Sequence, residues 1–301
     1  MKKFITLLCI LSLLLTLVFP MATVTGMNNG IKICLYTLIP SFFPFLLITN
    51  VMLKYDLVKY ISGFIAPVFS RLFKVSANGS FVVLMGFTCG YPMGVKTAHD
   101  LLVTGKISRY EFLHLIKFCN NPSLSFTINY VCYSLLNNEC NIIKILICVY
   151  GSSIITGIIS GLTNPPPTKT TIYSPQTEPL EVTYKNMNVF IASTKTLLTI
   201  SSYVLIFSTL TEFMKLICQT AFLPYDIVIT LTEITNGLNY FSSLYSMSNF
   251  IPLIIIALIS GGASITAQTL SFLQGKEEIK SYAFGKLYCL ATALFLYTTL
   301  K

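Results

Sequence analysis

The chain has 301 residues, of which 54% are hydrophobic and only 10% are charged, and its formal net charge is +9. A soluble domain carries about 25% charged residues, so this composition excludes a globular protein with a fully hydrated surface. The positive charge does not indicate nucleic-acid binding, because basic residues cluster between apolar runs and at their ends, where they set membrane orientation. The sequence predicts an all-α, multi-pass protein of the cell membrane, with membrane lipids as its surroundings.

Most of the long apolar runs are close to the roughly 20 residues that cross a bilayer core. In chain order they are residues 4–19, 33–53, 142–162, 188–211, 250–273 and 283–300. The first run belongs to an N-terminal segment, residues 1–30, whose basic start fits either a signal peptide or an uncleaved anchor helix. We favour the anchor helix, because the small-residue cleavage signal near Ala22 is weak.

The first membrane half, residues 31–162, contains the stretch "LMGFTCGYPMGVKTAHD" at 84–100. Gly90, Pro92 and Gly94 interrupt an apolar helix, and Tyr91 and Lys96 stand beside the interruption. Backbone groups freed by such a break must face protein or a hydrated cavity rather than lipid. The alternative is close helix packing, because Gly86, Gly90 and Gly94 form overlapping GxxxG spacings.

Two further segments of this half depart from a straight span. Residues 56–75 have basic ends and contain Gly63 and Pro67, which fits an interfacial or broken helix. Asn120 and Asn121 precede Pro122 and a short apolar run; they are candidates for a polar site, although Asn-Pro is also ordinary turn chemistry. A polar, proline-rich linker, residues 163–187, then separates the two halves.

The second membrane half, residues 188–301, contains a polar element at 225–247. At helical spacing Asp226, Thr230, Glu233, Gly237 and Tyr240 would share one face. A carboxylate at membrane depth is costly and normally faces a partner or a wet cavity. Glu233 is therefore a candidate for binding a cation, a proton or a donor-rich solute, and the alternative is that it meets water at the membrane interface.

The two halves share an order of features. When residues 84–119 are laid over 254–289, Gly105-Lys106 falls on Gly275-Lys276. In each copy a glycine-rich break precedes a helical run, a Gly-Lys turn and another helix, which indicates a duplication, although two membrane hairpins can also resemble each other by chance. Repeats with interrupted helices in corresponding positions point to the binding site of a transporter.

Catalytic, metal and nucleotide motifs do not stand out. The nine cysteines show no CxxC spacing and no Cys/His metal pattern, and no P-loop, HExxH or GxSxG motif occurs. The sequence thus predicts neither an enzyme nor a cofactor or metal site.

Several motifs resemble one known family. "IPSFFPFLLITNVM" at 39–52, "MGFTCGYPMGVKTAHDLLVTGKIS" at 85–108, "FCNNPS" at 118–123, "LTEITNGL" at 231–238 and "ISGGASITAQ" at 259–268 resemble, in order, the sporulation integral membrane proteins of the YlbJ type. The resemblance covers about residues 35–300. It departs slightly at "SGGAS", where the family more often reads "GGLS".

That family belongs to the nucleoside-recognition, or Gate-domain, group. The resemblance implies a Gate-like fold in both halves, each with a broken or re-entrant helical element, and a role in spore formation, notably of the cortex. It does not imply a substrate.

We expect the protein to transport a small polar solute or ion. The alternative is a non-transporting scaffold that recruits spore-maturation proteins. A homo-oligomer is compatible with either function. The candidate path residues are Glu233, Gln268, Gly237, Asn236, Gly261, Gly262, Ser264, Gly90, Tyr91, Pro92, Gly94, Lys96, Asn120 and Asn121.

Overall fold

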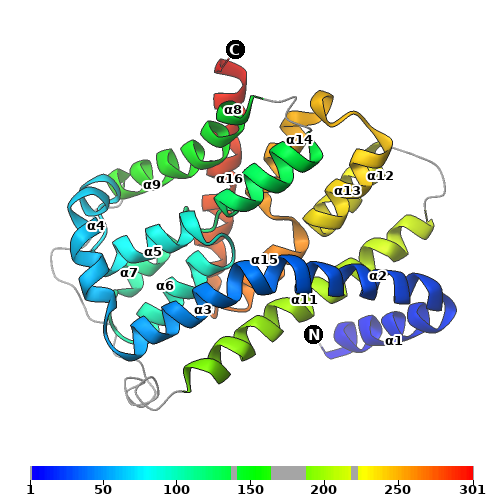
Figure 1. Cartoon of the computed structure of the whole chain (residues 1–301), viewed down its shortest axis with the longest axis horizontal. Coiled ribbons are helices and arrows are strands. Elements are labelled where there is room, and N and C mark those ends of the chain that lie inside the picture. The colour runs from blue at the N-terminus through cyan, green and yellow to red at the C-terminus, as the bar shows by residue number, and fades with distance from the viewer. Residues whose placement is uncertain (1, 137–140, 164–187, 218–222, 301) are drawn as a thin grey trace.

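The computed structural model describes residues 2–136, 141–163, 188–217 and 223–300, and these residues form helices joined by short turns, with no strand among them (Figure 1). The all-α fold class is thus confirmed. The predicted linker lies outside the described residues, apart from Thr163. The helices are α1 (Lys2–Val18), α2 (Pro20–Ile33), η1 (Cys34–Leu38), α3 (Ile39–Lys54), α4 (Val58–Phe73), α5 (Ala77–Thr88), α6 (Met93–Val103), α7 (Arg109–Leu115), η2 (Phe126–Leu135), α8 (Ile142–Leu146), η3 (Ile147–Gly151), α9 (Ser152–Thr163), α11 (Val189–Ile217), α12 (Leu223–Thr232), α13 (Ile234–Leu244), η4 (Met247–Phe250), α14 (Ile251–Ser260), α15 (Gly262–Leu270) and α16 (Lys276–Thr299).

Four helical stretches in the described part of the chain are long and apolar enough to cross a membrane: Pro20–Lys54, Ile142–Thr163, Val189–Leu216 and Ile251–Leu270. The bent pair α4–α5, whose axes differ by 87°, could make a fifth span. The chain is therefore a multi-pass membrane protein. Helix α4 runs through Gly63 and Pro67 without a break, and the sharp bend falls after it, where Lys74 has a left-handed backbone.

The predicted breaks are present in both halves. Helix α5 stops at Thr88 and α6 starts at Met93, and in the second half α14 stops at Ser260 and α15 starts at Gly262. A short turn then leads to α7 in the first half and to α16 in the second. The order of features predicted for the two halves therefore holds in the structure.

The polar element of the second half folds differently from its predicted single face. The helix breaks at Glu233, and α13 turns back on α12, so that the two lie side by side (Figure 1). Gly237 packs against the backbone of Thr230, where a Cβ would collide. Asp226 accepts hydrogen bonds from the hydroxyls of Tyr240 (3.2 Å) and Tyr245 (2.8 Å) across the hairpin. The expectation of one continuous face was wrong, because an N-cap at Glu233 starts a new helix.

Helix α11 packs along the continuous helix formed by α2, η1 and α3. Small residues allow this approach, since Gly26 and Gly30 of α2 lie directly against the backbone of α11 at Thr209 and Leu205. Two larger apolar clusters form the rest of the interior. One is built mainly by α4 to α7, and the other by η2, η3, α13, α14 and α16.

Candidate functional site

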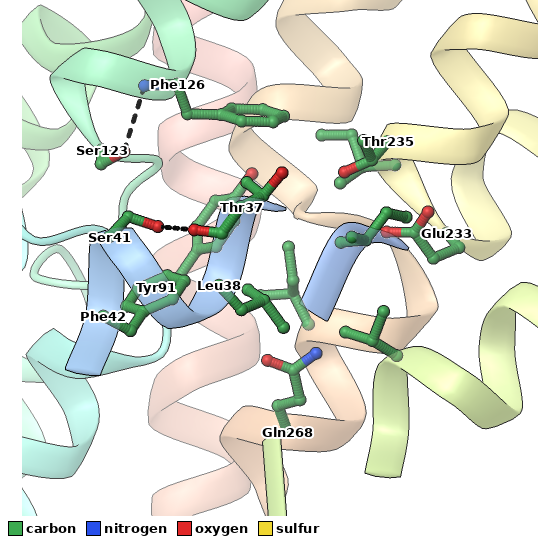
Figure 2. A pocket seen from close by; sticks show the side chains of 14 residues that line it. Thr37, Leu38, Ser41, Phe42, Tyr91, Ser123, Phe126, Glu233, Thr235 and Gln268 are labelled. Carbon is green, nitrogen blue, oxygen red and sulfur yellow. Dashed lines mark hydrogen bonds between the residues drawn. The ribbon is translucent and has the colours of Figure 1, made fainter. Parts of the chain in front are cut away.

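A small cavity lies where the broken elements of the two halves meet α3 and α11. Its volume is about 70 Å³. Figure 2 shows Ser41 and Tyr91 on one side, Glu233 and Thr235 opposite them, and the Gln268 amide entering from below. The lining residues are Ile33, Thr37, Leu38, Ser41, Phe42, Tyr91, Ser123, Phe126, Val204, Glu233, Ile234, Thr235, Ile265 and Gln268.

Glu233 is the only acidic or basic residue in this lining, and its side chain is almost fully buried. It is the N-cap of α13, because the Asn236 amide donates to Glu233 Oε2 at 2.7 Å. Among the ion pairs formed by the described residues, none includes Glu233. The Asn236 amide and the backbone and side-chain groups of Thr235 occupy acceptor positions of a carboxylate that has about four, so at least one position remains toward the cavity.

Gln268 faces the same cavity from α15 and is 3% exposed. Its amide donates to the hydroxyl of buried Ser264, one turn earlier, at 3.2 Å. This contact holds the amide in place and leaves its oxygen available as an acceptor. Gln268 and Glu233 therefore bring oxygen acceptors to the cavity from two different helices.

The glycine break of the second half brings these two helices together. Gly261 and Gly262 have φ of 73° and 69°, a region that side chains with a Cβ rarely adopt. A Cβ on Gly262 would lie 2.8 Å from the carbonyl oxygen of Leu231, at the end of α12. The two breaks of the second half thus pack directly on each other, which only glycine permits at this position.

The break of the first half supplies Tyr91. Gly90 has φ of 89° and packs against Ser123, and the Tyr91–Pro92 bond is cis. The Tyr91 ring lines the cavity, and its hydroxyl is buried without a hydrogen-bond partner in the described part of the structure. Only 7% of Tyr91 is exposed. An unpaired buried hydroxyl is uncommon, and it marks this region as one that can take up a polar group.

Three half-helices begin close to the cavity. Helix α6 starts two residues after Tyr91, α13 starts one residue after Glu233, and α15 starts within two turns of Gln268. The positive ends of helix dipoles stabilise negative charge nearby by about 0.3–1 kcal/mol each. At the start of α13 this effect, together with the Asn236 amide, offsets part of the cost of burying a negative charge on Glu233.

The remaining predicted site residues lie away from the cavity lining. Gly94, like Gly86, packs against the Cys119 carbonyl, as the alternative of close helix packing requires. Lys96 pairs locally with Asp100 at 2.5 Å inside α6. Asn121 accepts from Ser153 at 2.6 Å.

Two of the predicted asparagines join helices instead. Asn236 donates to Ser208 of α11 at 2.9 Å. Asn120 donates to Thr269 of α15 at 3.0 Å and to Tyr282 of α16 at 3.1 Å, which ties the two halves together.

Lys286 of α16 was missed by the sequence reasoning. Its ammonium donates to the main-chain oxygens of Asn120 (2.5 Å) and Ile259 (2.6 Å), so it joins the first half to the end of α14. It also lies 5.9 Å from the centre of the Tyr91 ring. A signal was present, because a lysine inside the apolar run 283–300 is as unusual as a carboxylate in a membrane segment.

Comparisons with known proteins agree with this architecture. Residues 35–174 match the family model Gate, described as nucleoside recognition. A stretch of 119 residues is 26% identical to the sporulation integral membrane protein YlbJ of Bacillus subtilis (strain 168). Over these residues the chain is similar to the Gate family and to the YlbJ-type membrane proteins. The aligned stretch covers 40% of the chain and 29% of that relative's length. No solved structure matches the chain.

The Gate match covers one wall of the cavity. Ser41, Tyr91 and Ser123 lie within it, whereas Glu233 and Gln268 follow its last residue. The resemblance to the YlbJ type that the sequence motifs indicated is confirmed. The role of each site residue stays a prediction that depends on the geometry.

Proposed function

We propose that the protein transports a small cation, alone or together with a small polar solute, through the cavity around Glu233. The observation that carries this proposal is a buried carboxylate that lines a cavity and has no ion-pair partner among the described residues. A buried charge is normally paired or coordinates a cation. The Gln268 oxygen and the hydroxyls of Ser41 and Thr235 add ligands of the type that hard cations accept.

The volume of the cavity favours a small solute over a large one. Sites for organic ligands usually measure about 300–1,000 Å³, whereas this cavity measures about 70 Å³. At about 10–15 Å³ of accessible volume per water, it holds an ion with a few waters, and a nucleoside does not fit. In this conformation the site therefore suits an ion, and a larger solute requires the walls to separate.

The setting that we propose is spore formation, notably of the cortex. The support is the relative named as a sporulation integral membrane protein and the order of shared motifs. Transport through a Gate-like membrane protein would supply an ion or a small solute to that process. Nothing in the described residues favours the scaffold alternative, since its main segment is the linker at 163–187.

The proposal is tested with purified protein in sealed liposomes. We expect faster flux of H⁺, Na⁺ or K⁺ than in protein-free liposomes, measured with a trapped pH dye and with radioactive tracers under an imposed gradient. Absence of flux for all three cations, in vesicles where the protein is inserted and folded, contradicts the proposal and leaves the scaffold hypothesis.

A further inference from the structure

A second hollow, separate from the cavity at Glu233, opens between α7, α9 and α16. Its volume is about 560 Å³, and none of its lining residues belongs to the first cavity. The side chains along it change in character from one end to the other. Lys117, Ser160 and Lys280 line one end, whereas Ile159, Phe284 and Tyr288 line the rest. We call this hollow the α9–α16 groove.

At the polar end of the groove, positively charged side chains outnumber negatively charged ones. Glu277 is at this end, and Arg109 lies 3.4 Å from it and 3.8 Å from Glu278, so one guanidinium is shared by two carboxylates. Lys117 and Lys280 belong to none of the ion pairs formed by the described residues. Three cations, Lys117, Lys280 and Arg109, thus accompany two carboxylates, Glu277 and Glu278, so this end of the groove has a net charge of +1.

A buried hydrogen-bond chain holds Lys117 in place. The Phe73 carbonyl can only accept, so His114 Nε2–H donates to it at 2.7 Å. His114 Nδ1 then accepts from the Ser160 hydroxyl at 3.0 Å, and Ser160 accepts from Lys117 Nζ at 3.2 Å. One of the three ammonium donors is used in this way, and the other two remain for a ligand.

The rest of the groove is apolar and open. Phe284 is 60% exposed, Tyr288 56% and Ile159 42%. Gly285 lets α16 lie directly on the backbone of Lys117, where a Cβ would collide. This close contact places the lysine beside the start of the apolar surface.

The polar end of the groove coincides with the polar ends of its helices. Helix α9 ends at Thr163, where the sequence continues "NPPPTKTT", and α16 begins at Lys276 after a Gln-Gly turn. Polar chain of this kind belongs outside the hydrocarbon core. The end of α9 and the start of α16 thus give the groove a polar end suited to a lipid headgroup, and the exposed aromatic side chains of α16 give it a surface suited to acyl chains.

We propose that the α9–α16 groove is a binding site for an anionic phospholipid. The headgroup phosphate would be bound by Lys117 and Lys280, and an acyl chain would lie along Phe284, Tyr288 and Ile159. Basic pockets between membrane helices bind anionic headgroups in this way. This site is independent of the transport proposed above, because it shares no lining residue with that cavity.

The test uses the full chain in bilayers of phosphatidylglycerol and phosphatidylcholine, with spin-labelled lipids to measure relative affinity. Two lysines at about 1 kcal/mol each correspond to a roughly 30-fold preference for phosphatidylglycerol. We expect Lys117→Gln/Lys280→Gln to abolish this preference. The matched control, Lys59→Gln/Lys276→Gln, removes equal charge outside the groove and should keep it.

A second variant tests the shape of the groove at constant charge. Ser281→Phe places a ring in the groove, and we expect it to reduce the phosphatidylglycerol preference as well. All variants are first checked for a monodisperse elution profile. The proposal is overturned if the unmodified protein shows no preference, or if the control pair loses as much preference as the groove pair.

Discussion

Replacing Glu233 separates its two roles, N-cap of α13 and acceptor in the cavity. Glutamine retains an oxygen that can accept from the Asn236 amide, which now lies 2.7 Å from the carboxylate, but it removes the charge. Alanine removes both. An N-cap contributes about 1 kcal/mol, so we expect Glu233→Ala to unfold about 2 °C lower and Glu233→Gln to unfold close to the unmodified protein.

The effect on transport is larger than the effect on stability. Removing one partner of a buried ionic contact costs about 3 kcal/mol, which is roughly a 100-fold loss of cation binding. We expect both variants to lose cation flux in liposomes by about this factor, although only the alanine variant is less stable. If Glu233→Gln supports the same flux as the unmodified protein, the carboxylate has only its capping role and the proposed cation site is wrong.

Other predictions concern the helix breaks, the missed lysine and a buried histidine. Gly262→Ala should lower the free energy of unfolding by about 2 kcal/mol, because φ is 69° and a Cβ would collide with a carbonyl. The control Gly63→Ala, whose Cβ would meet no other atom, should be neutral or slightly stabilising. Equal thermal stability of the two variants would refute this prediction. Lys286→Met leaves two buried carbonyls without their donor and should lower the free energy of unfolding by about 2 kcal/mol. An unchanged denaturant unfolding curve would contradict the role of Lys286 in joining the two halves. Burial lowers the pKa of His114, in α7 between the candidate spans, from 6.5 to about 4. Neutral His114 therefore makes its full contribution to the free energy of unfolding above pH 6.5, and this contribution falls as the pH drops toward 4. Near pH 5.5 the free energy of unfolding should be lower by about 1 kcal/mol, and His114→Gln should lack this pH dependence.

Much of the architecture could be predicted because the bilayer constrains it strongly. Four of the six apolar runs coincide with candidate spans, whereas residues 4–19 and 283–300 do not. Glycines in an apolar helix marked the breaks at Gly90 and Gly261. Each of these signals is local in the sequence. The carboxylate of Glu233 stood out for the same reason, since a charge is rare at membrane depth.

The rest depends on contacts that are distant in the sequence. Ser41 and Thr37 line the cavity, yet in the sequence they are ordinary small polar residues within an apolar helix. The turn at Glu233 was missed because a 3.6-residue period continues through it, and only the N-cap and the glycine contact at Gly237 reveal a hairpin. Lys96 has a partner four residues away, so its charge is satisfied locally and does not reach the cavity.

The claim that the broken elements enclose a hydrated cavity is tested most directly by water access to Gln268, which is 3% exposed and faces that cavity. Gln268→Cys and, as a buried control, Ile254→Cys would be made in a cysteine-free background and treated in membranes with a hydrophilic, membrane-impermeant thiol reagent. We expect the cysteine at 268 to react and the cysteine at 254 to remain unmodified. If both are equally unreactive from either side of the membrane, the cavity is dry and closed, and the proposed path through it does not exist.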